Sequence, residues 1–146
     1  MKALVPLLLA TMLLAAAPAV AGERSMVLIV SADSPVTHLD AIEVRKLFLG
    51  LTVMRNDLPL RALDNHSDEA LRQAFLQNVV AMPEHTYEKR LLSIMLQQGA
   101  RRPQVYTTTP ALLAAVAADP SAISVAWATD VAQDRHIKVL RVLWRD

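Results

Sequence analysis

The sequence alternates short runs of apolar, strand-forming residues with amphipathic helical segments, and this alternation limits the fold more than any other feature. Residues 26–30 are five consecutive apolar residues, which predicts a strand buried on both faces. Residues 58–63, 122–128 and 137–143 predict further strands. Because strands alternate with helices, we expect an α/β domain: a mixed, mainly parallel sheet with helices on both faces.

Four amphipathic segments predict the helices of this domain. The first follows Asp40, a residue type that caps helices, and Gly50 stands where this helix is expected to stop. The others are expected over residues 69–80, 85–98 and 110–118, where apolar residues recur at helical spacing or a proline suits the first turn. Each helix therefore has an apolar face that can pack on the sheet.

The first 21 residues are typical of a secretory signal peptide. Lys2 is the only charge before Glu23, residues 3–16 form an uncharged apolar run, and Ala19 and Ala21 supply the small residues that a signal peptidase reads. The apolar run is shorter than the roughly 20 residues that span a bilayer. We expect cleavage after Ala21, which leaves the 125 residues 22–146 as one domain.

The composition limits the compartment and the function class. The chain has no cysteine, which suits a periplasmic domain stabilised by its core and excludes thiol chemistry. Its 15 Lys and Arg residues face 14 Asp and Glu, so loss of Lys2 leaves a neutral domain with no general attraction for nucleic acid. The dispersed histidines and the lack of hydrolase or phosphate-loop motifs predict no metal, no cofactor and no enzyme activity.

Several segments resemble the substrate-binding proteins of phosphate ABC transporters. Residues 39–50 are similar to the helix that ends in an IF-x-G signature in that family, and residues 30–35 resemble the strand-and-loop entry of its short, single-lobe members. Residues 58–60 and 71–75 are similar to L-x-P-V and R-x-x-F, and residues 122–125 stand in the place of G-A-I-G-Y. The resemblance implies the fold of one lobe of a type 2 periplasmic binding protein.

The turn that leads into the helix at Glu69 is the main candidate site. A helix N-terminus has unpaired backbone N–H groups and a positive dipole end, which together favour an anion. The Ser67 hydroxyl can donate a hydrogen bond, and Arg61 or Arg72 can contact two oxyanion oxygens. The resemblance implies that Arg61 and Ser67 are phosphate-contacting positions.

The same segment also has a structural interpretation, and its acidic residues favour it. Asp64, Ser67 or Asp68 can cap the helix, and Arg61 can pair with one of the carboxylates on the surface. Asp68 and Glu69 at the helix start would repel a phosphate dianion.

Ser34 and Thr37 are secondary candidates. They lie in the loop that follows the first strand, and ligands of open α/β sheets bind beyond the carboxyl ends of strands. A role in the turn is the favoured alternative for both residues.

These observations predict a periplasmic protein that binds a phosphate-like oxyanion, as a solute-binding or accessory component of a phosphate ABC uptake or sensing system. One lobe covers a ligand only partly, so tight binding would need a second copy or a partner lobe. The alternative is a protein-interaction or sensor module that keeps the fold without the ligand and contacts a membrane transporter or receptor. Ser121 and Ser124, which stand where the family has glycines, favour this alternative.

Overall fold

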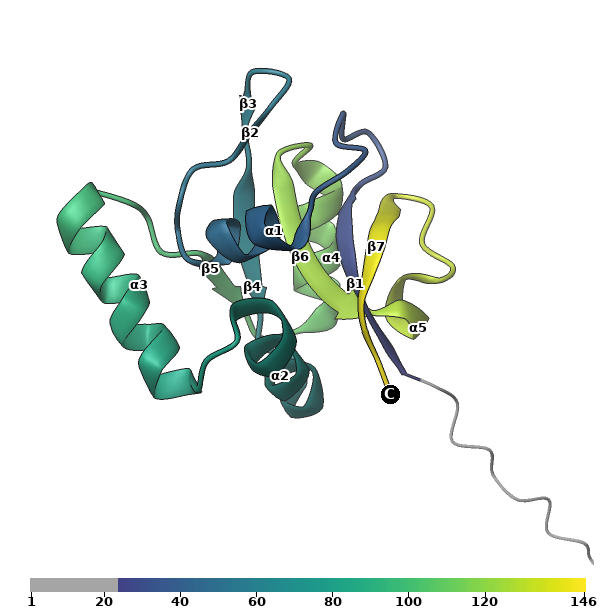
Figure 1. Ribbon diagram of the computed structural model, residues 1–146. Coiled ribbons are helices and arrows are strands. Elements are labelled where there is room, and N and C mark those ends of the chain that lie inside the picture. The colour runs from purple at the N-terminus through teal and green to yellow at the C-terminus, as the bar shows by residue number, and fades with distance from the viewer. Residues whose placement is uncertain (1–23) are drawn as a thin grey trace, which may run out of the picture.

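The computed structural model describes residues 24–146, and the expected signal peptide, residues 1–21, lies outside this part of the chain. A five-stranded sheet with the order β5-β4-β6-β1-β7 forms the centre (Figure 1). Four strands run in one direction and β1 runs against them, which confirms the expected mixed, mainly parallel sheet. The strands are β1 (Ser25–Ser31), β4 (Arg61–Asn65), β5 (Gln104–Tyr106), β6 (Ala122–Trp127) and β7 (Ile137–Arg145).

Helices cover both faces of the sheet, as expected. One face packs against three α-helices and a π-helical turn, whereas the opposite face packs against two α-helices. The first group is α1 (Ala41–Phe48), α2 (Glu69–Phe75), the π-helical turn η1 (Leu76–Val80) and α3 (Glu84–Gln98). The second group is α4 (Thr109–Ala118) and α5 (Ala128–Val131). We call the two faces the α1 face and the α4 face.

The position of β1 explains its continuous apolar run. Met26, Leu28 and Val30 point to the α1 face, and Val27 and Ile29 point to the α4 face, with every one of them buried. Burial of one such aliphatic side chain contributes about 1.5–3 kcal/mol. Because β1 lies between β6 and β7 and helices cover both of its faces, it has no polar face and its residues do not alternate between apolar and polar.

The start and the end of α1 follow the expected signals. The Asp40 carboxylate accepts a hydrogen bond from Glu43 N at 2.8 Å, and Glu43 accepts one from Asp40 N at 2.9 Å, which is a capping box. After the helix ends, Gly50 adopts a φ of 81°. A Cβ there would lie 3.3 Å from the carbonyl oxygen of Arg101, so this turn requires glycine.

The sequence predicts one strand over residues 58–63, but in the structure this segment belongs to two strands. A hairpin of β2 (Met54–Arg55) and β3 (Leu58–Pro59) comes first, and β4 begins after Leu60. Asn56 and Asp57 form the hairpin turn with φ of 50° and 63°, a conformation that asparagine and aspartate tolerate. The turn that leads into the helix at Glu69 begins only after Asn65, because Asp64 and Asn65 belong to β4.

Candidate anion-binding site

The carboxyl ends of β4 and β5 lie side by side, because the strands pair in parallel with Asn65 opposite Tyr106. α2 begins just after β4 and α4 just after β5, so two helix N-termini share this edge of the sheet. The Thr109 hydroxyl donates a hydrogen bond to the Ser67 oxygen at 3.1 Å, and His66 N donates to the Tyr106 carbonyl at 2.8 Å. We call residues 65–69 and 106–109 the carboxyl edge.

Ser67 is held in place by Asn65. The Ser67 hydroxyl and its backbone N both donate to Asn65 Oδ1, at 2.6 and 3.0 Å. Asn65 is buried, and its amide nitrogen donates to the Val125 carbonyl on β6 at 2.9 Å. The hydroxyl of Ser67 is therefore positioned by two strands, and it must leave Asn65 in order to donate to an anion.

Asp68, not Ser67, caps α2. Its carboxylate accepts a hydrogen bond from Leu71 N at 2.9 Å, and its backbone is extended, as an N-cap requires. The capping interpretation of this turn is thus confirmed for Asp68. Ser67 stands one residue before the cap, next to Thr109 of the neighbouring helix.

Arg72 forms a network inside the protein and does not face an open site. Its Nη1 donates to Asp64 at 2.8 Å, and Nε and Nη2 donate to the two carboxylate oxygens of Glu84 at 2.9 and 2.6 Å. The guanidinium also lies over the rings of Phe75 and Tyr87, 5.3 and 5.5 Å from their centroids. The expectation that Arg72 contacts a ligand disagrees with this geometry, because two carboxylates of the chain already hold it.

The charges around this network are mostly negative. The hydrogen bonds from Arg72 hold the pKa of Glu84 below its usual value. Burial alone would lower the pKa of Arg72, but the hydrogen bonds to Glu84 and the charge of Asp64 raise it. His66 Nε2 lies 3.0 Å from the second Asp64 oxygen. Since Asp68 also lies here, carboxylates outnumber the cations near the carboxyl edge.

Arg61 stands at the opposite end of β4 from Ser67. It pairs with Asp119, just before β6, at 2.7 Å, and both side chains are partly exposed. Burial alone would raise the pKa of Asp119, but hydrogen bonds from Ser121 and Arg61 lower it. Because a strand rises about 3.3 Å per residue, β4 separates the two positions by roughly 15–20 Å. The expectation that Arg61 and Ser67 hold one anion together is therefore wrong.

Ser34 and Thr37 lie at the same end of the sheet as Arg61, because β1 runs opposite to β4 and its carboxyl end is there. Ser34 is buried, and its hydroxyl oxygen accepts a hydrogen bond from Val36 N at 3.2 Å. Thr37 is exposed. The carboxyl end of β1 does not meet those of the parallel strands, so these two residues do not join Ser67 in one site.

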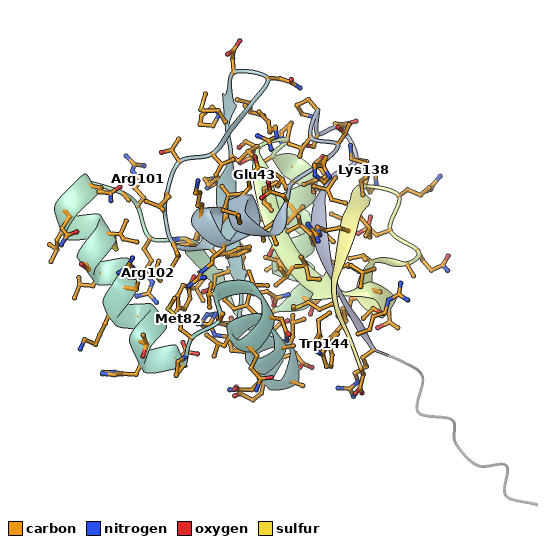
Figure 2. The ribbon with its side chains drawn as sticks, in the orientation of Figure 1. Glu43, Met82, Arg101, Arg102, Lys138 and Trp144 are labelled. Atoms are coloured by element: carbon orange, nitrogen blue, oxygen red, sulfur yellow. The ribbon has the colours of Figure 1, made fainter. Side chains whose placement is uncertain are left out.

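Two hollows lie away from Ser67. One, of about 340 Å³, lies between the end of α1 and the start of β5, and Arg61, Arg101 and Arg102 are among the residues that line it. Figure 2 shows Arg101 and Arg102 beside α3, on the far side of the sheet from β7. The other, of about 500 Å³, lies at the turn from η1 to α3 and includes Met82.

Asn65 and Thr109 are the carboxyl-edge residues that the sequence did not single out. The sequence does indicate that Thr109 lies at a helix start, because it directly precedes Pro110, a residue that suits the first turn of a helix. Asn65 had none, because it is one of several polar residues in a row, and only its place on β4 shows that it is buried.

No group of three or more potential metal ligands occurs within residues 24–146. In that same range, every helix is too short or too polar to cross a membrane.

No family model matches the sequence, and no curated protein matches it. The structure, however, matches an ABC-type phosphate transport receptor from Vibrio cholerae with a TM-score of 0.57 and 15% identity, over 82% of this chain and 46% of that one. The fold is that of a phosphate-transporter substrate-binding protein. A protein described as such from Clostridium perfringens, with bound phosphate, matches with a TM-score of 0.56 and 17% identity, over 72% of this chain and 40% of that one.

PstS from Borrelia burgdorferi gives the same result, with a TM-score of 0.56, 11% identity, and coverage of 81% of this chain and 47% of PstS. The chain spans less than half the length of each of these three proteins. The match thus confirms the expected fold, and its extent fits a single lobe of a PstS-type protein.

Proposed function

We propose that this protein is an exported oxyanion-binding lobe of the phosphate type, which serves a phosphate uptake or sensing system in the periplasm. The observation that supports this most is the pairing of two helix N-termini at the carboxyl edge, joined by the Ser67 and Thr109 hydroxyls. One of the three similar solved structures contains bound phosphate. The signal-like segment of residues 1–21 supports export.

The proposed binding step exchanges hydrogen bonds at the carboxyl edge. Thr109 donates to Ser67 and Ser67 donates to Asn65 in the structure. An oxyanion at the mouth of α2 and α4 would accept from both hydroxyls and from backbone N–H groups of the two first turns. The two helix dipoles add an attraction that needs no cationic side chain.

Affinity at this edge is expected to be weak. Asp68 occupies the N-cap of α2, and its charge opposes an anion there. One lobe also leaves much of a small ligand in contact with water. We therefore expect a Kd for phosphate on the order of 1 mM for the isolated protein, and tighter binding where a second lobe covers the edge.

A second candidate function is that of an interaction module without a ligand. The state of Arg72 favours it, because the buried guanidinium near the edge is held by Asp64 and Glu84. Such a module would use the same fold to contact a transporter or a receptor domain.

A titration followed by backbone amide NMR shifts tests the proposal, with phosphate as ligand and sulfate as comparison. We expect saturable shifts at residues 66–70 and 107–111, which the double variant Ser67→Ala, Thr109→Val removes. Arg61→Ala and Thr37→Ala are matched controls at the other end of the sheet and should leave the titration unchanged.

Each other outcome overturns the proposed site. Saturable shifts around Arg61, Arg101 and Arg102 would move the anion to the arginine-lined hollow. No shifts with either anion from the folded protein would favour the interaction module.

A further inference from the structure

β7 forms a free outer edge of the sheet. It pairs with β1 on one side, and no other described strand pairs with it (Figure 1). The strand is nine residues long, from Ile137 to Arg145. A long free edge presents backbone N–H and C=O groups that can pair with an added strand. The outer side of β7 is therefore a surface with a defined backbone pattern, and it lies away from the carboxyl edge of β4 and β5.

Over residues 138–142 the two faces of β7 differ in chemistry. The pairing of β7 with β1 shifts register twice, so Lys138 and Arg141, three residues apart, both lie opposite residues of β1 that point to the α1 face. Leu140 packs on the core of that face, whereas Val139 and Val142 lie opposite residues that point to the α4 face. The valines are 46% and 38% exposed. A strand beside residues 138–142 would thus have two cations next to one of its faces and two exposed valines next to the other.

The cations of β7 have no carboxylate partners within the described residues. Lys138, Arg141 and Arg145 take part in none of the ion pairs found there. Lys138 Nζ donates to the Ser34 carbonyl at 2.9 Å, and Arg141 Nη1 donates to the Leu39 carbonyl at 3.2 Å. These neutral acceptors hold the two side chains, which are half-buried, without cancelling their charge. Figure 2 shows Lys138 near the start of β7 and Trp144 near its end.

We propose that the free edge of β7 binds an extended segment of a partner protein in which acidic and apolar residues alternate. Such a segment adds a sixth strand. Its backbone pairs with β7, its carboxylates lie beside Lys138 and Arg141, and its apolar residues cover Val139 and Val142. The alternation is required because successive residues of a regular added strand point to opposite faces. This inference is independent of the proposed anion binding, which uses other residues.

Charge argues against a second copy of this chain as the occupant. The antiparallel register that overlaps two β7 strands over residues 137–145 places Arg141 opposite Arg141 of the other copy. Like charges directly opposite each other destabilise a strand pair. β7 contains no acidic residue that another register could bring against its cations. The same cations therefore discourage self-pairing and favour an acidic partner.

The test uses the purified protein and a peptide of alternating valine and glutamate that carries an uncharged fluorophore. Comparison peptides replace glutamate by lysine, or keep the composition in a non-alternating order. Fluorescence anisotropy gives affinity, and hydrogen exchange of the β7 amides gives location. The double variant Lys138→Glu, Arg141→Glu should weaken binding of the glutamate peptide at least tenfold and improve binding of the lysine peptide.

Two further variants keep this test decisive. Val142→Asp changes an exposed side chain and should weaken binding without loss of the fold. The double variant Lys89→Glu, Arg90→Glu makes the same charge reversal on the exposed side of α3 and should have no effect. Slower exchange of β7 amides with the glutamate peptide would support the proposal. Equal binding of all three peptides, protection elsewhere, or protection by self-association without peptide would overturn it.

Discussion

The guanidinium of Arg72 and the carboxylate of Asp64 form an ion pair at 2.8 Å whose side chains are only 5% and 3% exposed. Glu84 binds the same guanidinium from the surface side. Asp64 lies on β4, Arg72 on α2 and Glu84 on α3, so one arginine joins three elements. The pair stands between the core of the α1 face and the carboxyl edge, and its removal should affect stability before it affects binding.

Arg72→Ala should destabilise the protein strongly. It leaves the Asp64 carboxylate buried without its main partner, and breaking a buried pair in this way costs about 3–5 kcal/mol. Urea unfolding followed by circular dichroism measures the change. Arg90→Ala, on the exposed side of α3, is the control and should change stability by less than about 0.5 kcal/mol. A cost below about 1 kcal/mol for Arg72→Ala would show that the pair is unimportant.

Tyr87→Phe should cost about 1–3 kcal/mol, because it leaves a buried carbonyl without its donor. The Tyr87 hydroxyl donates to the Phe48 carbonyl at 2.5 Å and joins α3 to the end of α1. Burial raises the pKa of this hydroxyl, so it keeps its proton throughout the usual range of pH. Tyr106→Phe is the control, since its hydroxyl has no hydrogen bond to the described residues. Equal stability of the two variants would contradict the prediction.

Acid should weaken the fold partly through Glu84. Its pKa lies below the usual 4.5 because Arg72 donates hydrogen bonds to its charged form. A carboxyl with a lowered pKa in the folded state stabilises the protein above its unfolded pKa, and this stabilisation is lost as the pH falls through the folded pKa. Glu84→Gln should therefore be less stable at pH 7 and lose less stability between about pH 5 and about pH 3. Thermal unfolding across this range measures the effect, and Glu69→Gln serves as the exposed control.

Ala81→Gly should stabilise the protein, although most glycine substitutions do the opposite. Ala81 ends the π-helical turn η1 in a left-handed conformation with φ of 56°. A side chain in that region costs about 1 kcal/mol, which glycine removes. Ala114→Gly, on the exposed side of α4, should instead destabilise by about 1 kcal/mol. Destabilisation by both variants in thermal unfolding would show that Ala81 is not strained.

The elements that the sequence predicts well are those with strong local signals. The run at residues 26–30 and the Asp40 cap of α1 correspond closely to β1 and to the start of α1. β5 escaped prediction because three residues show no periodicity, and it is defined by its pairing with β4. The β2–β3 hairpin was not predicted, because its turn lacks the glycine that usually marks a two-residue hairpin turn.

The site was harder to predict than the fold, because the sequence does not show which ends of strands meet. Arg61 and Ser67 are close in sequence, yet an intervening strand separates them. Ser34 follows a strand, but β1 is antiparallel to its neighbours, so its carboxyl end lies at the opposite end of the sheet from Ser67. The sequence also does not show that Glu84 binds the Arg72 guanidinium, because Glu84 belongs to another helix.

The direction of β1 also has a consequence for how the chain acquires its structure. β1 is synthesised first, yet both strands that flank it come from the last part of the described chain. Met26 and Trp144 are partners on the order of 100 residues apart, and pairing across such separations slows folding. The central sheet therefore cannot close until β6 and β7 are available. Under the export proposed above, this delay gives the chain time before it folds, because its most apolar strand has no partner until residues 122–145 have been made.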